Sequence, residues 1–167
     1  MKFNVNQQDL QQALSYCQGV IEKRSTLPIL SNVLLDAKNS HLTITATDLD
    51  LIFLHKIRNI EVIEEGKTTT TSSIMYDIVR KFSSGKKINL SLSDTSKLQL
   101  ESEKSVFNLN CISSSEFPLT DESFNDNEFS INSKSLLKLL NKCKFSVSND
   151  ETRHYLSGIY FHQTEVE

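Results

Sequence analysis

The stretch RSTLPILSNVLL, residues 24–35, predicts the opening of a β-strand, and a related stretch, HYLSGIYF, lies near the end of the chain. Adding 126 to each number (156 minus 30) places Leu30 on Leu156 and Ser31 on Ser157. The same ungapped shift pairs identical or similarly apolar residues: Phe3 with Phe129, Val5 with Ile131, Asn6 with Asn132, Leu10 with Leu136, Leu14 with Leu140, Cys17 with Cys143, Val33 with Ile159 and Leu35 with Phe161. A repeat of this length predicts a repeated structural unit.

The repeat and the composition together predict how the chain is divided. Its 167 residues are 38% hydrophobic and 23% charged, which is typical of a soluble globular protein. One domain of ordinary size accounts for a period of 126 residues. We therefore expect one complete unit over residues 1–120 and the beginning of a second over 121–167. A unit that stops there leaves an apolar face uncovered, so we expect a fragment of a longer protein.

The sequence contains no targeting signal and no cysteine pattern of a metal site. It has no apolar run of about 18 residues and no apolar signal segment after its first residues, so we expect a cytoplasmic protein. Cys17, Cys111 and Cys143 are widely spaced and form no metal-binding pair. Cys17 and Cys143 fall on apolar helix faces, and we expect both to be buried thiols.

Hydrophobic periodicity predicts an α+β fold. We expect helices over 7–21, 72–82 and 133–145, the first and third capped by Asn6 and Asn132 and the second by Ser72 or Ser73, with Gly85 ending it. We expect strands over 2–5, 29–37, 41–47, 51–63, 67–71, 88–92, 98–101, 106–112, 128–131 and 155–163. The first unit is therefore predicted to contain the order strand, helix and three strands, and then the same order a second time. This order predicts two helices packed on one side of a largely antiparallel sheet.

Charge is divided between these elements. The net charge is −3, yet the helices with their ends, over 6–24, 72–87 and 132–147, hold ten basic residues against three acidic ones. The rest of the chain holds eight basic and eighteen acidic residues. A basic surface on helices suits a phosphate backbone that is bound without sequence readout. Lys134, Lys138 and Lys142 form one helical stripe, although lysines also commonly solvate a helix face, and both interpretations remain open.

The sequence does not read as an enzyme. The four histidines are scattered, and no metalloprotease, serine-hydrolase, Walker or dinucleotide-binding motif occurs. Asp48 and Asp50 could ligate a cation, but two aspartates in a short polar connection more often shape a turn. We expect no catalytic residue, no metal site and no cofactor.

Several motifs together resemble one family. RSTLPIL at 24–30, ATDLDL at 46–51 and RHYLSGIYF at 153–161 are similar to the bacterial β sliding clamp, the processivity subunit of DNA polymerase III. The resemblance implies the DNA-clamp fold, with two strand–helix–three-strand halves per domain. It also implies a two-protomer ring of three domains each, helices lining a hole for duplex DNA, and a non-catalytic role in tethering the polymerase. Domain one would then be complete, domain two incomplete and domain three absent.

The resemblance also implies roles for individual residues. The resemblance implies DNA contacts by Arg24, Arg80, Arg153, His154 and Tyr155, and the basic charge of the helices adds Lys81, Lys134, Lys138 and Lys142 to the expected contacts. Lys104, Phe107 and Leu109 match the edge that meets the other protomer, and Leu156 matches one wall of the groove that receives peptides of polymerase and clamp-loader subunits. A second hypothesis assigns a different class of function: the chain is a clamp fragment that forms no ring and acts only as a protein-interaction module.

Overall fold

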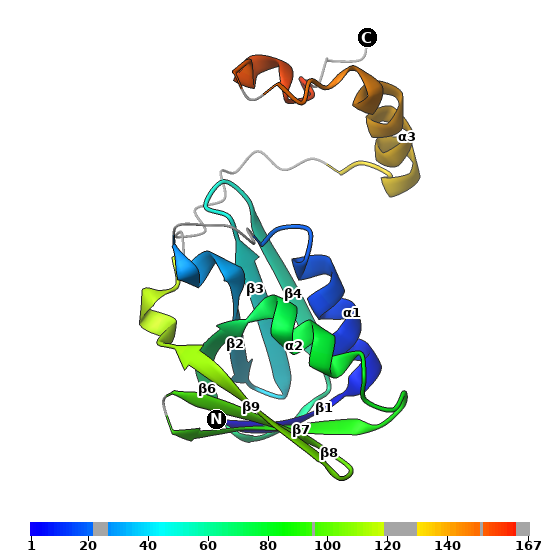
Figure 1. Cartoon of the computed structure of the whole chain (residues 1–167). Coiled ribbons are helices and arrows are strands. Elements are labelled where there is room, and N and C mark those ends of the chain that lie inside the picture. Colours follow the sequence, from blue (N-terminus) through cyan, green and yellow to red (C-terminus); the bar gives the residue numbers. More distant parts are fainter. Residues whose placement is uncertain (22–26, 95, 119–129, 151, 163–167) are drawn as a thin grey trace. The chain divides into compact units, whose positions relative to one another are not determined.

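The first unit is built on one nine-stranded sheet in which every pair of neighbouring strands is antiparallel (Figure 1). The computed structural model describes residues 1–21, 27–94, 96–118, 130–150 and 152–162. The chain divides into two compact units, Met1–Thr120 and Asp121–Glu167, and each is described here by itself.

The strands of the first unit are β1 (Lys2–Asn6), β2 (Asn32–Lys38), β3 (His41–Thr47), β4 (Ile52–Arg58), β5 (Glu61–Glu64), β6 (Gly66–Thr71), β7 (Lys87–Asp94), β8 (Lys97–Ser102) and β9 (Ser105–Ile112). Its helices are α1 (Gln7–Cys17) and α2 (Ser72–Val79), with short 3-10 turns η1 (Pro28–Ser31) and η2 (Ser114–Glu116).

The two halves of this unit exchange their first strands. The sheet order is β4-β3-β2-β6-β9-β8-β7-β1-β5. Strand β1 precedes α1 but pairs with β7 of the other half, with Phe3 opposite Leu90. Strand β6 precedes α2 but pairs with β2, with Val33 opposite Thr70. Because each half supplies a strand to the other, neither half has a complete sheet of its own.

Threonine side chains reinforce the junction of β6 with β9, where the two parts of the sheet, β4-β3-β2-β6 and β9-β8-β7-β1-β5, are joined. Only two residue pairs join β6 to β9 in register, Thr69 with Ile112 and Thr70 with Cys111. The Thr69 hydroxyl donates to the carbonyl of Ile112 at 2.8 Å, and the Thr70 hydroxyl donates to the carbonyl of Asn110 at 3.0 Å. These partly buried bonds supplement a short ladder between β9 and β6.

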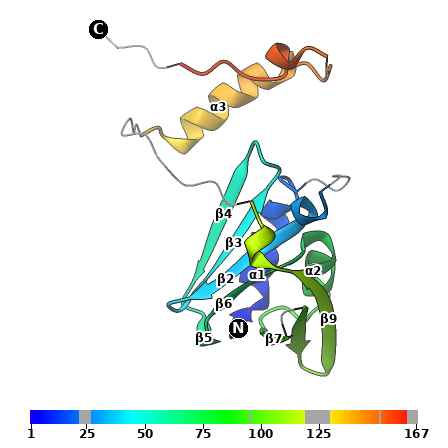
Figure 2. The ribbon, with the colours of Figure 1, turned by 90° about the vertical axis from the view of Figure 1, so that its left-hand side faces the viewer.

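Helices α1 and α2 lie side by side against one face of the sheet, as predicted (Figures 1 and 2). The alternating strands and the apolar stripes of both helices meet in one core. Its fully buried large side chains include Phe3, Leu10, Leu14, Leu35, Leu42, Ile44, Met75, Ile88, Leu90, Leu98 and Leu100. The core therefore holds both helices against the sheet with their other faces outward.

Local hydrogen bonds set the helix ends, and the predicted ends need correction. Asn6 caps α1 as predicted, since its side chain accepts from the backbone N–H of Gln8 at 2.9 Å. The helix ends at Cys17 rather than at residue 21. Helix α2 is shorter than the predicted 72–82, ending at Val79, and its N-cap is Thr71. Ser72 does not cap it; its hydroxyl accepts from the Gln18 side chain at 2.9 Å and ties the helices together.

Two predicted strands also need correction. The strand predicted over 29–37 begins only at Asn32, because Pro28 opens a 3-10 turn that Ser31 closes by donating to the Pro28 carbonyl at 2.7 Å. The run predicted over 51–63 is two strands, β4 and β5. Asn59 separates them with a φ of 59°, a left-handed conformation that asparagine tolerates well.

In the second unit, α3 (Ser133–Cys143) is the counterpart of α1, because adding 126 to the ends of α1 gives the ends of α3. Asn132 caps it as predicted, accepting from the backbone N–H groups of Lys134 and Ser135 at 3.0 and 3.3 Å. The predicted helix 133–145 closes with the 3-10 turn η3 (Lys144–Ser146), and a further turn, η4 (His154–Leu156), follows.

The strands predicted at 128–131 and 155–163 do not form in the described residues of this unit. Residues 130–131 and 157–162 have no strand pairing, while 128–129 and 163 lie outside the described residues. Strand β2 of the first unit is held by pairing with β3 and β6, whereas the described residues of the second unit contain no strand. The expectation that Cys143 is buried is wrong: Cys17 is buried, but Cys143 is exposed.

The exchanged strand β1 provides a test of the core. Phe3 is completely buried, whereas Lys2 on the same strand is exposed. We expect Phe3→Ala to lower the free energy of unfolding by about 3–5 kcal/mol, and Lys2→Ala to change it by less than about 0.5 kcal/mol. Urea denaturation of both variants measures this. A loss below about 1 kcal/mol for Phe3→Ala would contradict the role of β1 in the core.

The two equivalent cysteines provide a second test. Burial raises the pKa of the Cys17 thiol to about 12, partly offset by a backbone hydrogen bond that lowers it. The reactive species is the thiolate, so Cys17 should resist alkylation at pH 8 until the protein unfolds, while Cys143 should react at once. Mass spectrometry of time-resolved alkylation checks this order. Equal rates for the two thiols would show that the first unit's core is open.

Candidate nucleic-acid interface

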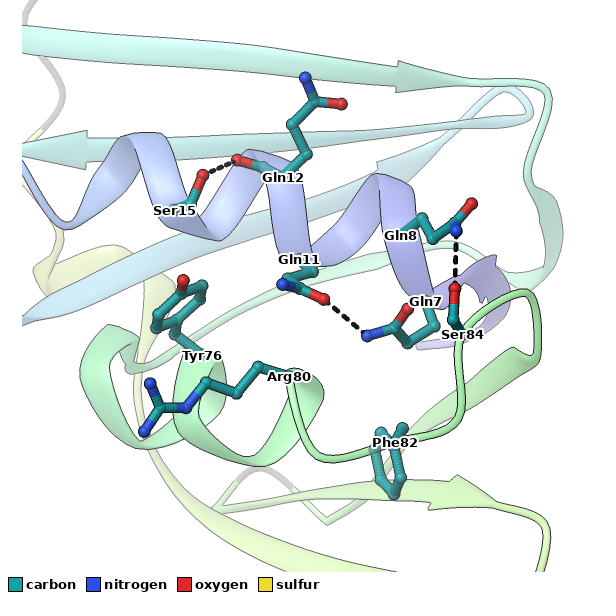
Figure 3. A pocket seen from close by; sticks show the side chains of 9 residues that line it. All are labelled: Gln7, Gln8, Gln11, Gln12, Ser15, Tyr76, Arg80, Phe82 and Ser84. Carbon is teal, nitrogen blue, oxygen red and sulfur yellow. Dashed lines mark hydrogen bonds between the residues drawn. The ribbon is translucent and has the colours of Figure 1, made fainter.

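A groove runs between the outward faces of α1 and α2 and has a volume of about 560 Å³ (Figure 3). Its lining is polar and carries one charged side chain: Gln7, Gln8, Gln11, Gln12, Ser15, Tyr76, Arg80, Phe82 and Ser84. The apolar faces of both helices pack in the core. The groove is therefore lined mainly by the side chains on their outward faces. It offers hydrogen-bonding groups together with the aromatic rings of Tyr76 and Phe82.

Side-chain amides connect the two helices beneath the groove. Gln7 is buried, and its Nε2 donates both to the backbone carbonyl of Val79 at 2.9 Å and to Oε1 of Gln11 at 2.8 Å. At the end of the groove, Nε2 of Gln8 donates to the hydroxyl of Ser84 at 2.6 Å. These bonds fix the relative position of α1 and of the turn that follows α2.

Arg80 caps α2 at its C-terminal end, where a cation is favourable. Its Nη2 lies 3.1 Å from Oδ1 of Asp77, and its guanidinium lies 5.8 Å from the centre of the Tyr76 ring. The side chain is about half exposed, so the ion pair is screened by water and leaves the other donors accessible. Lys81 is exposed beside it. Arg80 and Lys81 are the two predicted DNA contacts that the described part of the first unit brings together.

The charge of the first unit's helices is lower than the sequence count suggests. Helix α1 contains Asp9 and α2 contains Asp77, and neither contains a basic residue. The basic residues that were counted with these helices lie at their ends, and two of them are engaged elsewhere. Lys86 lies 3.2 Å from Glu103, and Lys87 lies 3.9 Å from Glu61.

Helix α3, by contrast, is basic. Lys134, Lys138 and Lys142 are each four residues apart, are exposed, and share one face of a helix that has no acidic residue. Leu136, Leu140 and Cys143 lie on the opposite face because successive residues turn by about 100°. The predicted lysine stripe therefore exists as a continuous surface.

A closed loop follows α3 and carries the other predicted contacts of this unit. The backbone N–H of Ser148 donates to the carbonyl of Leu156 at 2.9 Å. Within the loop, Arg153 lies 3.4 Å from Asp150. Hydrogen bonds from the Thr152 hydroxyl and then its backbone N–H lower the pKa of Asp150, which keeps that carboxylate charged. Tyr155 is 82% exposed on η4, which also contains His154.

The residues predicted to meet other proteins lie at separate places. Phe107 is partly exposed on β9, and its ring lies 5.8 Å from that of Phe82. Lys104 is exposed in the turn before β9, whereas Leu109 is 8% exposed and belongs to the core. Leu156 is 42% exposed on η4 of the second unit. Arg24 lies outside the described residues.

Sequence reasoning missed the glutamines of α1. Gln7 and Gln11 are four residues apart, as are Gln8 and Gln12, which is a helical spacing that could have identified a polar face. Asp48 does shape a turn, as predicted: its Oδ1 accepts from the backbone N–H groups of Asp50 and Leu51 at 3.1 and 2.7 Å. Among the described residues, no three His, Cys, Asp or Glu side chains gather as a metal site requires. No helix in the described part of the chain is long and apolar enough to cross a membrane.

The antiparallel sheet with two helices on one face is the DNA-clamp fold. Residues 1–121 match the family described as DNA polymerase III beta subunit, N-terminal domain. The chain belongs to this family.

Similar proteins agree with this assignment. The chain is 35% identical over 164 residues to the beta sliding clamp of Caulobacter vibrioides, covering 97% of this chain and 44% of that protein. It is 34% identical over 169 residues to the beta sliding clamp of Rickettsia felis, covering 100% and 44%. The sliding clamp of Bartonella birtlesii, solved bound to griselimycin, superposes with a TM-score of 0.93 at 34% identity, covering 99% of this chain and 44% of that one. The chain thus spans less than half the length of these relatives.

Proposed function

We propose that this chain is part of a sliding clamp, a ring that surrounds duplex DNA and holds the replicative polymerase on it without catalysing a reaction itself. The proposal is supported by family membership and by similarity to proteins named beta sliding clamp. In such a ring, α1, α2 and α3 would face the DNA and the sheet would face outward. Tethering makes each rebinding of the polymerase intramolecular, which raises its effective concentration.

The observation that carries the proposal is the lysine stripe of α3. Three exposed lysines on one helix face, with no acidic residue on that helix, form a local positive surface on a chain whose net charge is −3. Such a surface attracts a polyanion without reading its sequence. Arg80, Lys81, Arg153, His154, Tyr155 and Arg24 would add further contacts. Contacts of this kind let a ring slide, because every phosphate along the duplex is equivalent.

Partner surfaces complete the proposal. Lys104, Phe107 and Leu109 would lie at the edge that meets a second protomer to close the ring, with Phe107 the more exposed of the two apolar side chains. Leu156 would form part of a groove for short peptides of polymerase and clamp-loader subunits. The partly exposed aromatic pair of Phe82 and Phe107 favours a protein contact at the first of these places.

The salt dependence of DNA binding tests the role of the stripe. We expect the variant with Lys134, Lys138 and Lys142 all changed to Gln to bind a short duplex more weakly. The slope of log affinity against log salt concentration should become shallower by about 0.9 per lysine, because fewer counterions are released. Fluorescence anisotropy over a salt series measures both quantities.

A matched control separates contact from overall charge. Lys38, Lys56 and Lys67 are exposed on β2, β4 and β6 of the sheet. Changing these three to Gln alters the net charge equally but should leave the slope nearly unchanged. If both triple variants lose the same slope, the stripe of α3 is an ordinary solvated helix face.

A further inference from the structure

A second pocket of the first unit is separate from the groove between α1 and α2. Its volume is about 380 Å³, within the range of about 300–1,000 Å³ that is typical of ligand sites. Four parts of the chain line it: η1 with the residue before it, the turn between β3 and β4, the end of β9, and η2 with the proline that follows. We call it the η1–η2 pocket, and its main lining residues are Leu27, Leu30, Leu49, Ile112, Glu116 and Pro118.

The lining of the η1–η2 pocket is apolar except for Glu116. Leu27 and Leu49 are 50% and 54% exposed, whereas Leu30 is buried and closes the base of the pocket. Large apolar side chains that stay in water around a hollow gain free energy when another apolar group covers them. The pocket therefore favours a ligand with apolar groups of side-chain size.

The backbone at Leu49 is strained. Its φ is 84°, in the left-handed region, where a bulky side chain is an outlier. Two hydrogen bonds hold this turn in place. The Thr47 hydroxyl oxygen accepts from the backbone N–H of Leu49 at 3.0 Å, and Asp48 donates its N–H to the carbonyl of Leu51 at 3.3 Å. Glycine or asparagine would fit this backbone with less strain and without exposing an apolar side chain. Strain that is kept at an exposed leucine indicates a binding role for its side chain.

The turn η2 carries the one charge of the lining. The Ser113 hydroxyl oxygen accepts from the N–H of Ser115 at 3.3 Å, and the N–H of Glu116 donates to the Ser113 carbonyl at 3.1 Å. Phe117 follows the turn and is buried, so it anchors this wall. Glu116 is exposed, and no ion pair within the described part of the first unit includes it. A cation next to an apolar group would complement this wall.

We propose that the η1–η2 pocket binds a short protein segment in which two neighbouring apolar side chains are followed by a lysine or arginine. The apolar side chains contact Leu27, Leu30 and Leu49. The cation pairs with Glu116. The repeat supports a peptide as the occupant, because adding 126 places Leu30 on Leu156, which would form part of a peptide groove in the second unit. That step rests on the proposed function, whereas the pocket itself is a separate site of the first unit.

Methyl NMR with a defined peptide tests the pocket. The probe is acetyl-Gly-Leu-Leu-Lys-Ser-Gly-amide, titrated into the chain with labelled leucine and isoleucine methyl groups. We expect saturable shifts at Leu27, Leu49 and Ile112, with half-saturation below about 1 mM. The methyl groups of Ile63, which is exposed on β5 and does not line the pocket, should not shift. A titration without saturable shifts at the pocket would overturn the proposal.

Leu49→Gly separates binding from stability. Loss of the side chain should weaken binding of the peptide about tenfold, because apolar contact area is lost. The thermal unfolding midpoint should not fall, since glycine relieves the strain at a φ of 84°. An unchanged peptide affinity in this variant would contradict the proposal.

Glu116→Gln tests the charge, and Glu101→Gln is its matched control. Glu101 is exposed on β8 and does not line the pocket, so both variants change the net charge equally. We expect Glu116→Gln to weaken peptide binding about threefold, as for an exposed ion pair, and Glu101→Gln to leave it unchanged. Equal losses in the two variants would remove the assigned role of Glu116.

Two further results would identify another site or another occupant. If Leu156→Ser abolishes peptide binding and Leu49→Gly does not, the peptide binds the second unit, which overturns this inference and leaves the proposed function intact. If the pocket methyl groups shift when the chain is concentrated without peptide, the occupant is a second copy, and the inference is overturned as well. A failure of the DNA salt series would remove the proposed function alone, because the NMR titration needs no DNA.

Discussion

The exchange of first strands between the two halves of the sheet is the constraint on which the first unit depends. Strand β1 completes the half that contains β7, and β6 completes the half that contains β2. The hydroxyls of Thr69 and Thr70 add hydrogen bonds to the short junction of β6 with β9. Each helix follows directly on an exchanged strand, so the same pairing that joins the halves also places α1 beside α2. The groove between them is a consequence of this topology.

The two units provide different surfaces from equivalent helices. Helix α1 and helix α3 occupy the same place in the repeat and share an asparagine cap, yet α1 presents glutamines and α3 presents lysines. A repeated fold conserves the core positions that it needs for packing and leaves the outward positions free to differ. A phosphate backbone can be bound by directed hydrogen bonds and by charge, and the two surfaces are suited to one each.

Sequence patterns predicted most of the architecture of the first unit, since alternating strands and apolar helix stripes report burial directly. These patterns failed where a structural feature depends on residues that are distant in the sequence. The exchange of β1 and β6 depends on pairings between residues far apart in the chain, and Asn59 divides a run that reads as one strand. The stretch 155–163 has the pattern of a strand, yet its described residues form no strand. The lysine stripe could be predicted from its four-residue spacing, whereas the orientation of Gln11 depends on Gln7, which donates to both the Val79 carbonyl and Oε1 of Gln11.

Native-state hydrogen exchange, followed residue by residue, tests most directly whether the exchanged strands make the first unit one cooperative structure. The account predicts that backbone amides in the β1–β7 and β2–β6 ladders open with the same free energy, equal to that of global unfolding, while amides of α3 exchange much faster. Two distinct opening free energies, one for each half of the sheet, would contradict it, because halves that open separately cannot hold α1 and α2 as a single surface.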